Sequence, residues 1–134
     1  GIPQMADESV CTTHDLMDVI KRRAAGVVQT KVAKNGGIWH MQRLWTLAQA
    51  DDLRIYPGNH PCTSIASASV AHLAAAWPGP LLDGAWAVGI TGAFAADVVR
   101  EPLVVADGAV EVPDRPGLGV ELDDEAVASM RIDR

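Results

Sequence analysis

The feature that most constrains the fold of this chain is a repeat of strand, loop and helix with a period of about 25 residues. Strands are expected to begin near residues 2, 27 and 53, and each is followed by a stretch with helical character. Strands that alternate with helices form a parallel sheet, and right-handed connections place every carboxyl end on one edge. The repeat therefore predicts an α/β fold.

Capping signals and apolar periodicity predict three helices. The first runs from a cap at Thr12 or Thr13 to about Arg23, with Asp15 placed to complete a capping box behind Thr12 and Gly26 expected to end the helix. The second covers residues 38–50 and the third residues 63–76. The buried side of the second helix is expected to consist of Ile38, Met41, Leu44, Trp45 and Leu47.

The repeat weakens after residue 80. Residues 85–90 are expected to form a fourth strand, Asp107 and Gly108 a hairpin turn, and residues 123–130 a terminal helix. A complete (β/α)8 barrel takes about 250 residues, so this chain supplies about half of one. We expect residues 1–97 to be the second half of a barrel. Residues 98–134 would be extended segments and a short helix packed on it or on a capping domain.

Three polar side chains lie just beyond the expected strands. Two directly follow the first and second strands, and the third lies in the loop after the third strand. They are the carboxylate of Asp7, the amine of Lys31 and the imidazole of His60. Barrels of βα units build their catalytic face from groups at the carboxyl ends of several strands. We therefore expect these three side chains to share one edge of the sheet.

Charge and hydropathy exclude several classes of protein. The net charge of −6 leaves no basic stripe for nucleic acid. No apolar stretch reaches the roughly 18–20 residues of a membrane span, and no signal peptide is visible. The expected location is therefore the cytoplasm, where Cys11 and Cys62 would be free thiols rather than a disulfide.

Several motifs carry a family resemblance. They are Met-Ala-Asp-Glu-Ser-Val at residues 5–10, Lys-Val-Ala-Lys-Asn-Gly-Gly at residues 31–37, and Val-Pro-Asp-Arg-Pro-Gly-Leu-Gly-Val at residues 112–120. Together with the 24-residue interval between Asp7 and Lys31, they resemble the C-terminal barrel portion of the enolase superfamily. The resemblance is to its muconate-lactonizing, mandelate racemase-like enzymes. It implies strands 5–8 of a (β/α)8 TIM-type barrel and a C-terminal segment that returns to a capping domain.

The resemblance also implies roles for site residues. Asp7 would be one of three carboxylates on Mg²⁺, a cation that prefers oxygen ligands, and Lys31 would be a general acid/base. We expect Mg²⁺ and Lys34 to lower the pKa of Lys31, because a base must be neutral before it acts. Glu8 would hold a ligand or lysine in place, or form an ordinary surface ion pair. Lys34 would orient the site or face solvent.

The loop at residues 58–64 follows the third expected strand, where the family contacts substrate. Asn59 and His60 are therefore candidate substrate-binding residues, although a loop histidine bonded to the backbone is an alternative. The loop lacks the acidic residue that the family carries there. Ala87 stands where the family has a glutamate, and Asp83 is the nearest acid. These departures concern the choice of substrate rather than the proton-abstracting chemistry.

The expected function is that of part of a Mg²⁺-dependent enzyme that removes the α-proton of a small carboxylate substrate. The outcome would be cycloisomerisation, racemisation or epimerisation, or dehydration. The alternative is a non-catalytic fragment or degenerate half-barrel with a binding or structural role. Retention of both Asp7 and Lys31 favours the enzyme. Because open sheet edges are an aggregation liability, the expected partners are the N-terminal half of the same enzyme and further copies in a homo-oligomer.

Overall fold

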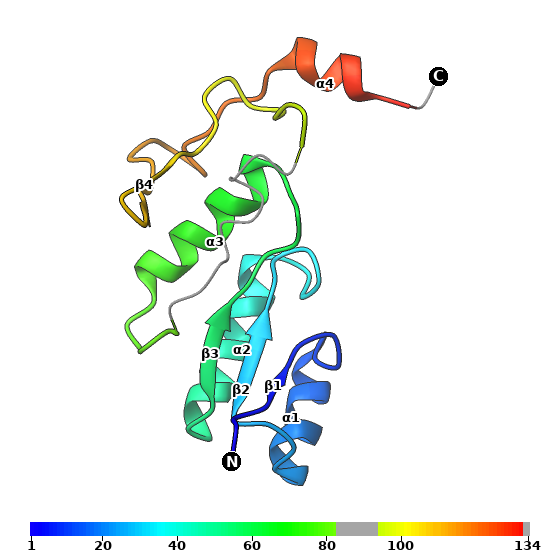
Figure 1. Ribbon diagram of the computed structural model, residues 1–134, viewed down its shortest axis with the longest axis vertical. Coiled ribbons are helices and arrows are strands. Elements are labelled where there is room, and N and C mark those ends of the chain that lie inside the picture. Colours follow the sequence, from blue (N-terminus) through cyan, green and yellow to red (C-terminus); the bar gives the residue numbers. More distant parts are fainter. Residues whose placement is uncertain (83–93, 133–134) are drawn as a thin grey trace.

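The computed structural model describes residues 1–82 and 94–132, and it shows three βα units followed by an extended C-terminal segment (Figure 1). The strands are β1 (Met5–Ala6), β2 (Val27–Thr30) and β3 (Arg54–Pro57), which lie side by side in that order. Both pairings are parallel. The predicted α/β class is therefore confirmed, and the carboxyl ends of the strands meet at one edge.

Helix α1 (Thr13–Arg22) begins as predicted, with a capping box. The Thr12 hydroxyl accepts from the Asp15 N–H at 3.2 Å, and the Asp15 carboxylate accepts from the Thr12 N–H at 2.7 Å. The predicted helical range, to about Arg23, is confirmed, but the prediction that Gly26 ends the helix is wrong. The last helical residue is Arg22, and Arg23 caps the helix in a left-handed conformation with φ of 49°. Gly26 directly precedes β2.

Helix α2 (Ile38–Ala50) has the predicted bounds, and α3 (Ser64–Ala76) begins one residue after its expected start. The buried face of α2 differs in part from the prediction, because Ile38 is 37 % exposed and Leu47 is half-buried. Ala48 is buried instead. Its position four residues after Leu44 continues the helical stripe more closely than Leu47 does.

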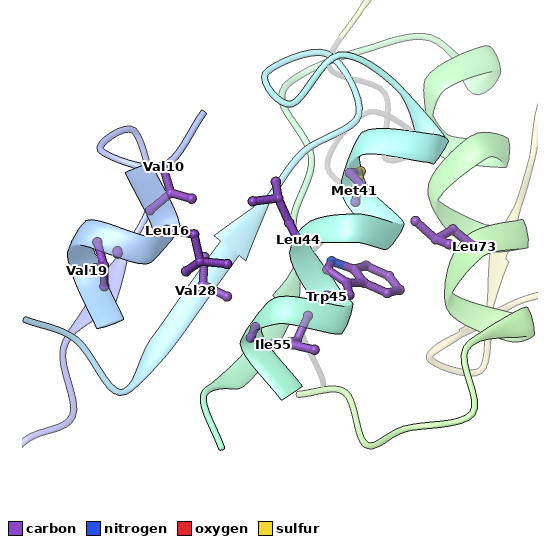
Figure 2. Close-up of a cluster of buried hydrophobic side chains, with 11 residues drawn as sticks. Val10, Leu16, Val19, Val28, Met41, Leu44, Trp45, Ile55 and Leu73 are labelled. Atoms are coloured by element: carbon purple, nitrogen blue, oxygen red, sulfur yellow. The ribbon is translucent and has the colours of Figure 1, made fainter. Parts of the chain in front are cut away.

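The core lies between the sheet and the helices that cover one of its faces (Figure 2). Val28 and Ile55 are paired in register, so their side chains point to the same face and pack against α1 and α2. Trp45 is fully buried there, and its indole N–H donates to the Thr30 hydroxyl at 2.7 Å. The ring of Trp77 meets Trp45 edge-on, with centroids 5.4 Å apart.

The first two strands are shorter than the predicted ranges of residues 2–5 and 27–32, whereas the third, predicted at residues 53–56, is shifted by one residue. Strand β1 starts at Met5 rather than Ile2, and β2 ends at Thr30 because the backbone N–H of Lys31 donates to the Asn35 side chain instead of continuing the ladder. The expected fourth strand at residues 85–90, with Ala87 and the nearby Asp83, lies outside the described residues. Just before it, the Leu82 N–H donates to the Ile55 carbonyl at 2.8 Å, so the chain runs beside β3 there.

The C-terminal segment contains the predicted hairpin, in which β4 (Val105–Ala106) and β5 (Ala109–Val110) pair antiparallel around Asp107 and Gly108. Helix α4 (Asp124–Met130) follows, capped by the Asp123 side chain. In Figure 1 this segment runs beyond α3, away from the three-stranded sheet. None of the helices in the described ranges has the length and apolar character that a membrane crossing requires.

Candidate functional site at the carboxyl ends of the strands

Asp7 and Lys31 directly follow neighbouring strands, β1 and β2, and their side chains meet. The loops that carry them are joined by Asn35, whose carboxamide oxygen accepts from the Lys31 N–H at 2.8 Å. Its amide N–H groups donate to the carbonyls of Val10 and Cys11 at 3.0 Å each. In the sequence, Asn35 before two glycines predicts only a turn and gives no sign that it joins the two loops. Asn35 is buried and fixes the two loops relative to each other.

The ammonium of Lys31 is the centre of the group. Its Nζ lies 2.8 Å from each carboxylate oxygen of Asp7 and also donates to Oε1 of Glu8. The Lys31 side chain is 6 % exposed, whereas the Asp7 side chain is 33 % exposed. A buried charge needs a partner, and here the buried amine has two carboxylates that open towards solvent.

Lys34 contacts the same carboxylate as Lys31. Its Nζ donates to Oδ1 of Asp7 at 2.9 Å, to the backbone carbonyl of Asp7 at 2.5 Å and to the carbonyl of Gln29 at 2.9 Å. Its side chain is 4 % exposed. Of the two alternatives for Lys34, the solvent-facing one is therefore wrong.

The pKa values of these groups follow from their contacts. Burial would lower the pKa of Lys31, but its hydrogen bonds to Asp7 and Glu8 outweigh burial and raise it. Burial would raise the pKa of Asp7, but the hydrogen bonds from Lys31 and Lys34 outweigh burial and lower it. The hydrogen bond from Lys31 likewise lowers the pKa of Glu8. The predicted lowering of the Lys31 pKa is not found in this arrangement, because carboxylates rather than cations face its ammonium.

The loop after β3 reaches this group through His60. Nε2 of His60 lies 3.7 Å from the same Glu8 oxygen that contacts Lys31. Glu8 therefore lies between the amine and the imidazole. Asn59 is directed elsewhere: its amide donates to the Ser67 hydroxyl on α3 at 3.2 Å, which ties the loop to that helix.

Of the six predicted site residues, five meet in one group: Asp7, Glu8, Lys31, Lys34 and His60. Asn59 stands apart. Cys11 and Cys62 are both free thiols, as predicted.

The donor set suits a hard divalent cation in part. Carboxylate oxygens such as those of Asp7 are the ligands that Mg²⁺ prefers, and the Asp7 side chain remains one-third exposed. Among residues 1–82 and 94–132, however, no three Asp, Glu, His or Cys side chains gather into a group able to hold a metal. Asp7 therefore fits as one member of a ligand set that needs further members.

Comparison with known proteins adds to this geometry. Residues 1–126 match the family described as enolase C-terminal domain-like. The chain is similar to muconate cycloisomerase 1 of Rhodococcus opacus, with 36 % identity over 135 residues that cover 94 % of this chain and 33 % of that protein. It is also similar to L-Ala-D/L-Glu epimerase of Bacillus subtilis, with 26 % identity over 126 residues, 88 % of this chain and 31 % of that protein.

Among solved structures, muconate cycloisomerase from Pseudomonas fluorescens has a similar fold, with a TM-score of 0.89 and 30 % sequence identity. The match covers 98 % of this chain and 36 % of that structure's chain. The chain thus spans about a third of the length of the relatives it matches. The family match extends over nearly all of its residues, and the chain therefore belongs to the enolase superfamily, among its muconate-lactonizing and mandelate racemase-like members.

Proposed function

We propose that this chain is the C-terminal half-barrel, strands 5–8, of an enzyme that removes the α-proton of a small carboxylate substrate. Lys31 is the general acid/base in this proposal, and Asp7 is one of the ligands of a catalytic Mg²⁺. The observation that supports it most directly is the contact of the Lys31 ammonium, at the end of β2, with Asp7 at the end of β1. Catalytic groups of βα-barrels come from such strand ends.

Lys31 must lose its proton before it accepts one from a substrate. In the present arrangement Asp7 and Glu8 raise its pKa and keep it charged. When the oxygens of Asp7 engage another cation, Lys31 loses one of the two partners that raise its pKa. Its burial then acts in the opposite direction and favours the neutral amine. Asp7 would therefore control the protonation state of Lys31 through what else it binds.

Mg²⁺, when bound, supplies positive charge that stabilises an enolate as it develops. This chain contributes Asp7 to that site, and the remaining ligands and a second lysine would come from the part of the protein that the relatives possess beyond this chain. The relatives include a cycloisomerase and an epimerase. An isomerase-type outcome is therefore proposed first, with dehydration as a further possible fate of the same enolate.

The open edge of the sheet at β1 argues for a partner strand there. Within the described residues, β1 has a neighbouring strand on one side only, since the strand order is β1-β2-β3. An unpaired parallel edge invites another strand. We propose that the N-terminal half of the same enzyme, in the same or a separate chain, pairs there and brings the capping domain against residues 98–134.

Solvent-deuterium exchange on the full-length protein tests the proposal. With Mg²⁺ in D₂O, wild-type protein should exchange the α-proton of at least one member of a carboxylate panel of dicarboxylates, lactones and dipeptides. Lys31→Met and Asp7→Asn should abolish the exchange. Lys21→Met is the matched control, because Lys21 is 63 % exposed on α1 and should leave exchange unchanged. Exchange that survives in Lys31→Met would refute the role of Lys31.

The alternative is a binding or structural role without catalysis. The incomplete metal group within the described residues favours it. Native mass spectrometry separates the two proposals. A stoichiometric partner that contributes further strand-end carboxylates supports the enzyme, whereas a stable species made of this chain alone supports the binding role.

A further inference from the structure

Two lysines contact Asp7, and they differ in what else they bind. Within residues 1–82 and 94–132, the ammonium of Lys31 contacts only side-chain oxygens, those of Asp7 and Glu8, and side chains can move away. Lys34 instead donates to two backbone carbonyls, those of Asp7 and Gln29, and to one carboxylate oxygen of Asp7. An ammonium has three N–H donors, so all donors of Lys34 are held by this chain.

The three acceptors of Lys34 lie on two strand ends. Gln29 belongs to β2, and Asp7 directly follows β1. Lys34 therefore joins the carboxyl ends of both strands and holds the Asp7 backbone and side chain at once. With 4 % of its side chain exposed, it is not free to exchange these partners for water.

We propose that Lys34 is a positioning residue for Asp7, which fixes the carboxylate at the strand end so that it serves as a metal ligand, while Lys31 is the exchangeable partner of the same carboxylate. This inference rests on the proposed function, because it presumes that Asp7 binds a divalent cation. Lys34 touches neither substrate nor reacting atoms in this role. It acts through the place and orientation of Asp7.

Two physical effects of Lys34 on a cation at Asp7 have opposite signs. As a positive charge it repels the cation, so that simple electrostatics predicts tighter metal binding once Lys34 is removed. As a positioning residue it orients the ligand, so that removal weakens binding, typically by ~10- to 100-fold for groups that orient metal ligands. The sign of the change in metal affinity therefore separates the two roles.

The experiment measures Mn²⁺ binding, as a probe of the Mg²⁺ site, by electron paramagnetic resonance on the full-length protein without substrate. Lys34→Met should weaken binding by at least about tenfold. Lys31→Met should leave Mn²⁺ affinity unchanged or increase it, because it removes a competing cation without freeing the Asp7 backbone. Lys21→Met, at an exposed position, is the control and should bind as wild type.

The outcomes separate this inference from the proposed function. If wild-type protein binds no Mn²⁺, or binds it equally well after Asp7→Asn, the metal role of Asp7 fails and the inference fails with it. If wild type binds through Asp7 but Lys34→Met binds equally well or more tightly, only the positioning role is overturned. The same holds if Lys31→Met weakens binding as much as Lys34→Met.

A measurement on wild-type protein tests the inference even if the Lys34→Met variant does not fold. Reductive methylation followed by mass spectrometry reports which ammonium groups are accessible. Lys34 should stay unmodified with and without Mg²⁺, whereas Lys21 should react in both states. A Lys34 that reacts as readily as Lys21 would show that its three bonds do not persist, and the inference would be wrong.

Discussion

The carboxylate of Asp97 caps helix α3 at Ser64, a residue 33 positions earlier in the chain. Oδ2 of Asp97 accepts from the Ser64 hydroxyl at 2.7 Å and from its backbone N–H at 3.0 Å. The same hydroxyl accepts from the Leu103 N–H at 3.1 Å. Thr63, which stands at the cap position, makes no side-chain bond to the helix. The C-terminal segment therefore provides the cap that the local sequence lacks.

Loss of this cap should destabilise the protein. Asp97→Ala removes the acceptor of two Ser64 donors, and lost caps typically cost about 0.5–2 kcal/mol of unfolding free energy. Urea unfolding followed by circular dichroism measures the change. Asp114→Ala, at an exposed position without positive φ, is the matched control and should shift the midpoint less. Equal shifts for the two variants would contradict the cap.

Thr30→Val should destabilise the core by about 1–3 kcal/mol, because it leaves the buried indole N–H of Trp45 without its acceptor at nearly constant side-chain volume. Thr46→Val is the control. Its hydroxyl bonds to the Gln42 carbonyl on the exposed side of α2, so the substitution should change the unfolding free energy by only a few tenths of that amount. The prediction fails if the denaturation midpoints of both variants match wild type.

Acidic pH should lower the unfolding free energy of the protein through protonation of Asp7. The hydrogen bonds from Lys31 and Lys34 hold the pKa of Asp7 below its ordinary value of 3.8, so its contribution is complete above that pH. The contribution is lost as the pH falls through the lower, folded-state pKa. Unfolding free energy should therefore drop less steeply between about pH 5 and pH 2 in Asp7→Asn than in wild type.

The control for the acid experiment is Asp18→Asn. Asp18 is about half-exposed and lies 4.0 Å from Lys21, a surface pair worth little. Its replacement should leave the pH slope close to that of wild type. If Asp7→Asn keeps the full wild-type slope, the carboxylate is not held by the two ammonium groups.

Alkaline pH should lower the unfolding free energy of the protein through deprotonation of Lys31. Its pKa lies above 10.5 in the folded protein, so the stabilisation from its contacts is present below pH 10.5 and is lost as the pH rises through the folded-state value. Lys31→Met should therefore flatten the alkaline fall of unfolding free energy. Thermal unfolding at a series of alkaline pH values checks this, with Lys21→Met expected to keep the wild-type fall.

Gly119 and Gly108 form a matched pair in the C-terminal segment. Both have positive φ, 69° and 75°, but a side-chain carbon at Gly119 would lie 2.4 Å from Cβ of Pro113, whereas Gly108 has open space. Gly108→Ala should cost about 1 kcal/mol for its backbone conformation alone. Gly119→Ala should cost more, because Pro113 must also move.

Hydrogen exchange of residues 113–122 measures this difference locally. Gly119→Ala should accelerate exchange there, while Gly108→Ala should leave these residues as in wild type. Equal exchange in the two variants would show that Pro113 yields without a penalty.

The sequence by itself determined the α/β repeat, the bounds of α2, the capping box of α1 and the shared sheet edge of Asp7 and Lys31. These features depend on apolar period, on side chains within a few residues of a helix end and on motifs that carry the family resemblance. A parallel repeat also requires that strand ends share an edge. The placement of Lys31 and Asp7 at one edge followed from that rule, whereas their direct contact did not.

Only the tertiary structure decided which partners those side chains have. Lys34 is buried against Asp7 and Gln29, the pKa of Lys31 is raised rather than lowered, and Asp97 caps α3 from 33 residues away. Each result depends on distances between segments far apart in the chain. For Lys31, burial lowers the pKa and hydrogen bonds to carboxylates raise it. The sequence identifies the lysine and the carboxylates but not the distances between them, and these distances determine which effect is larger.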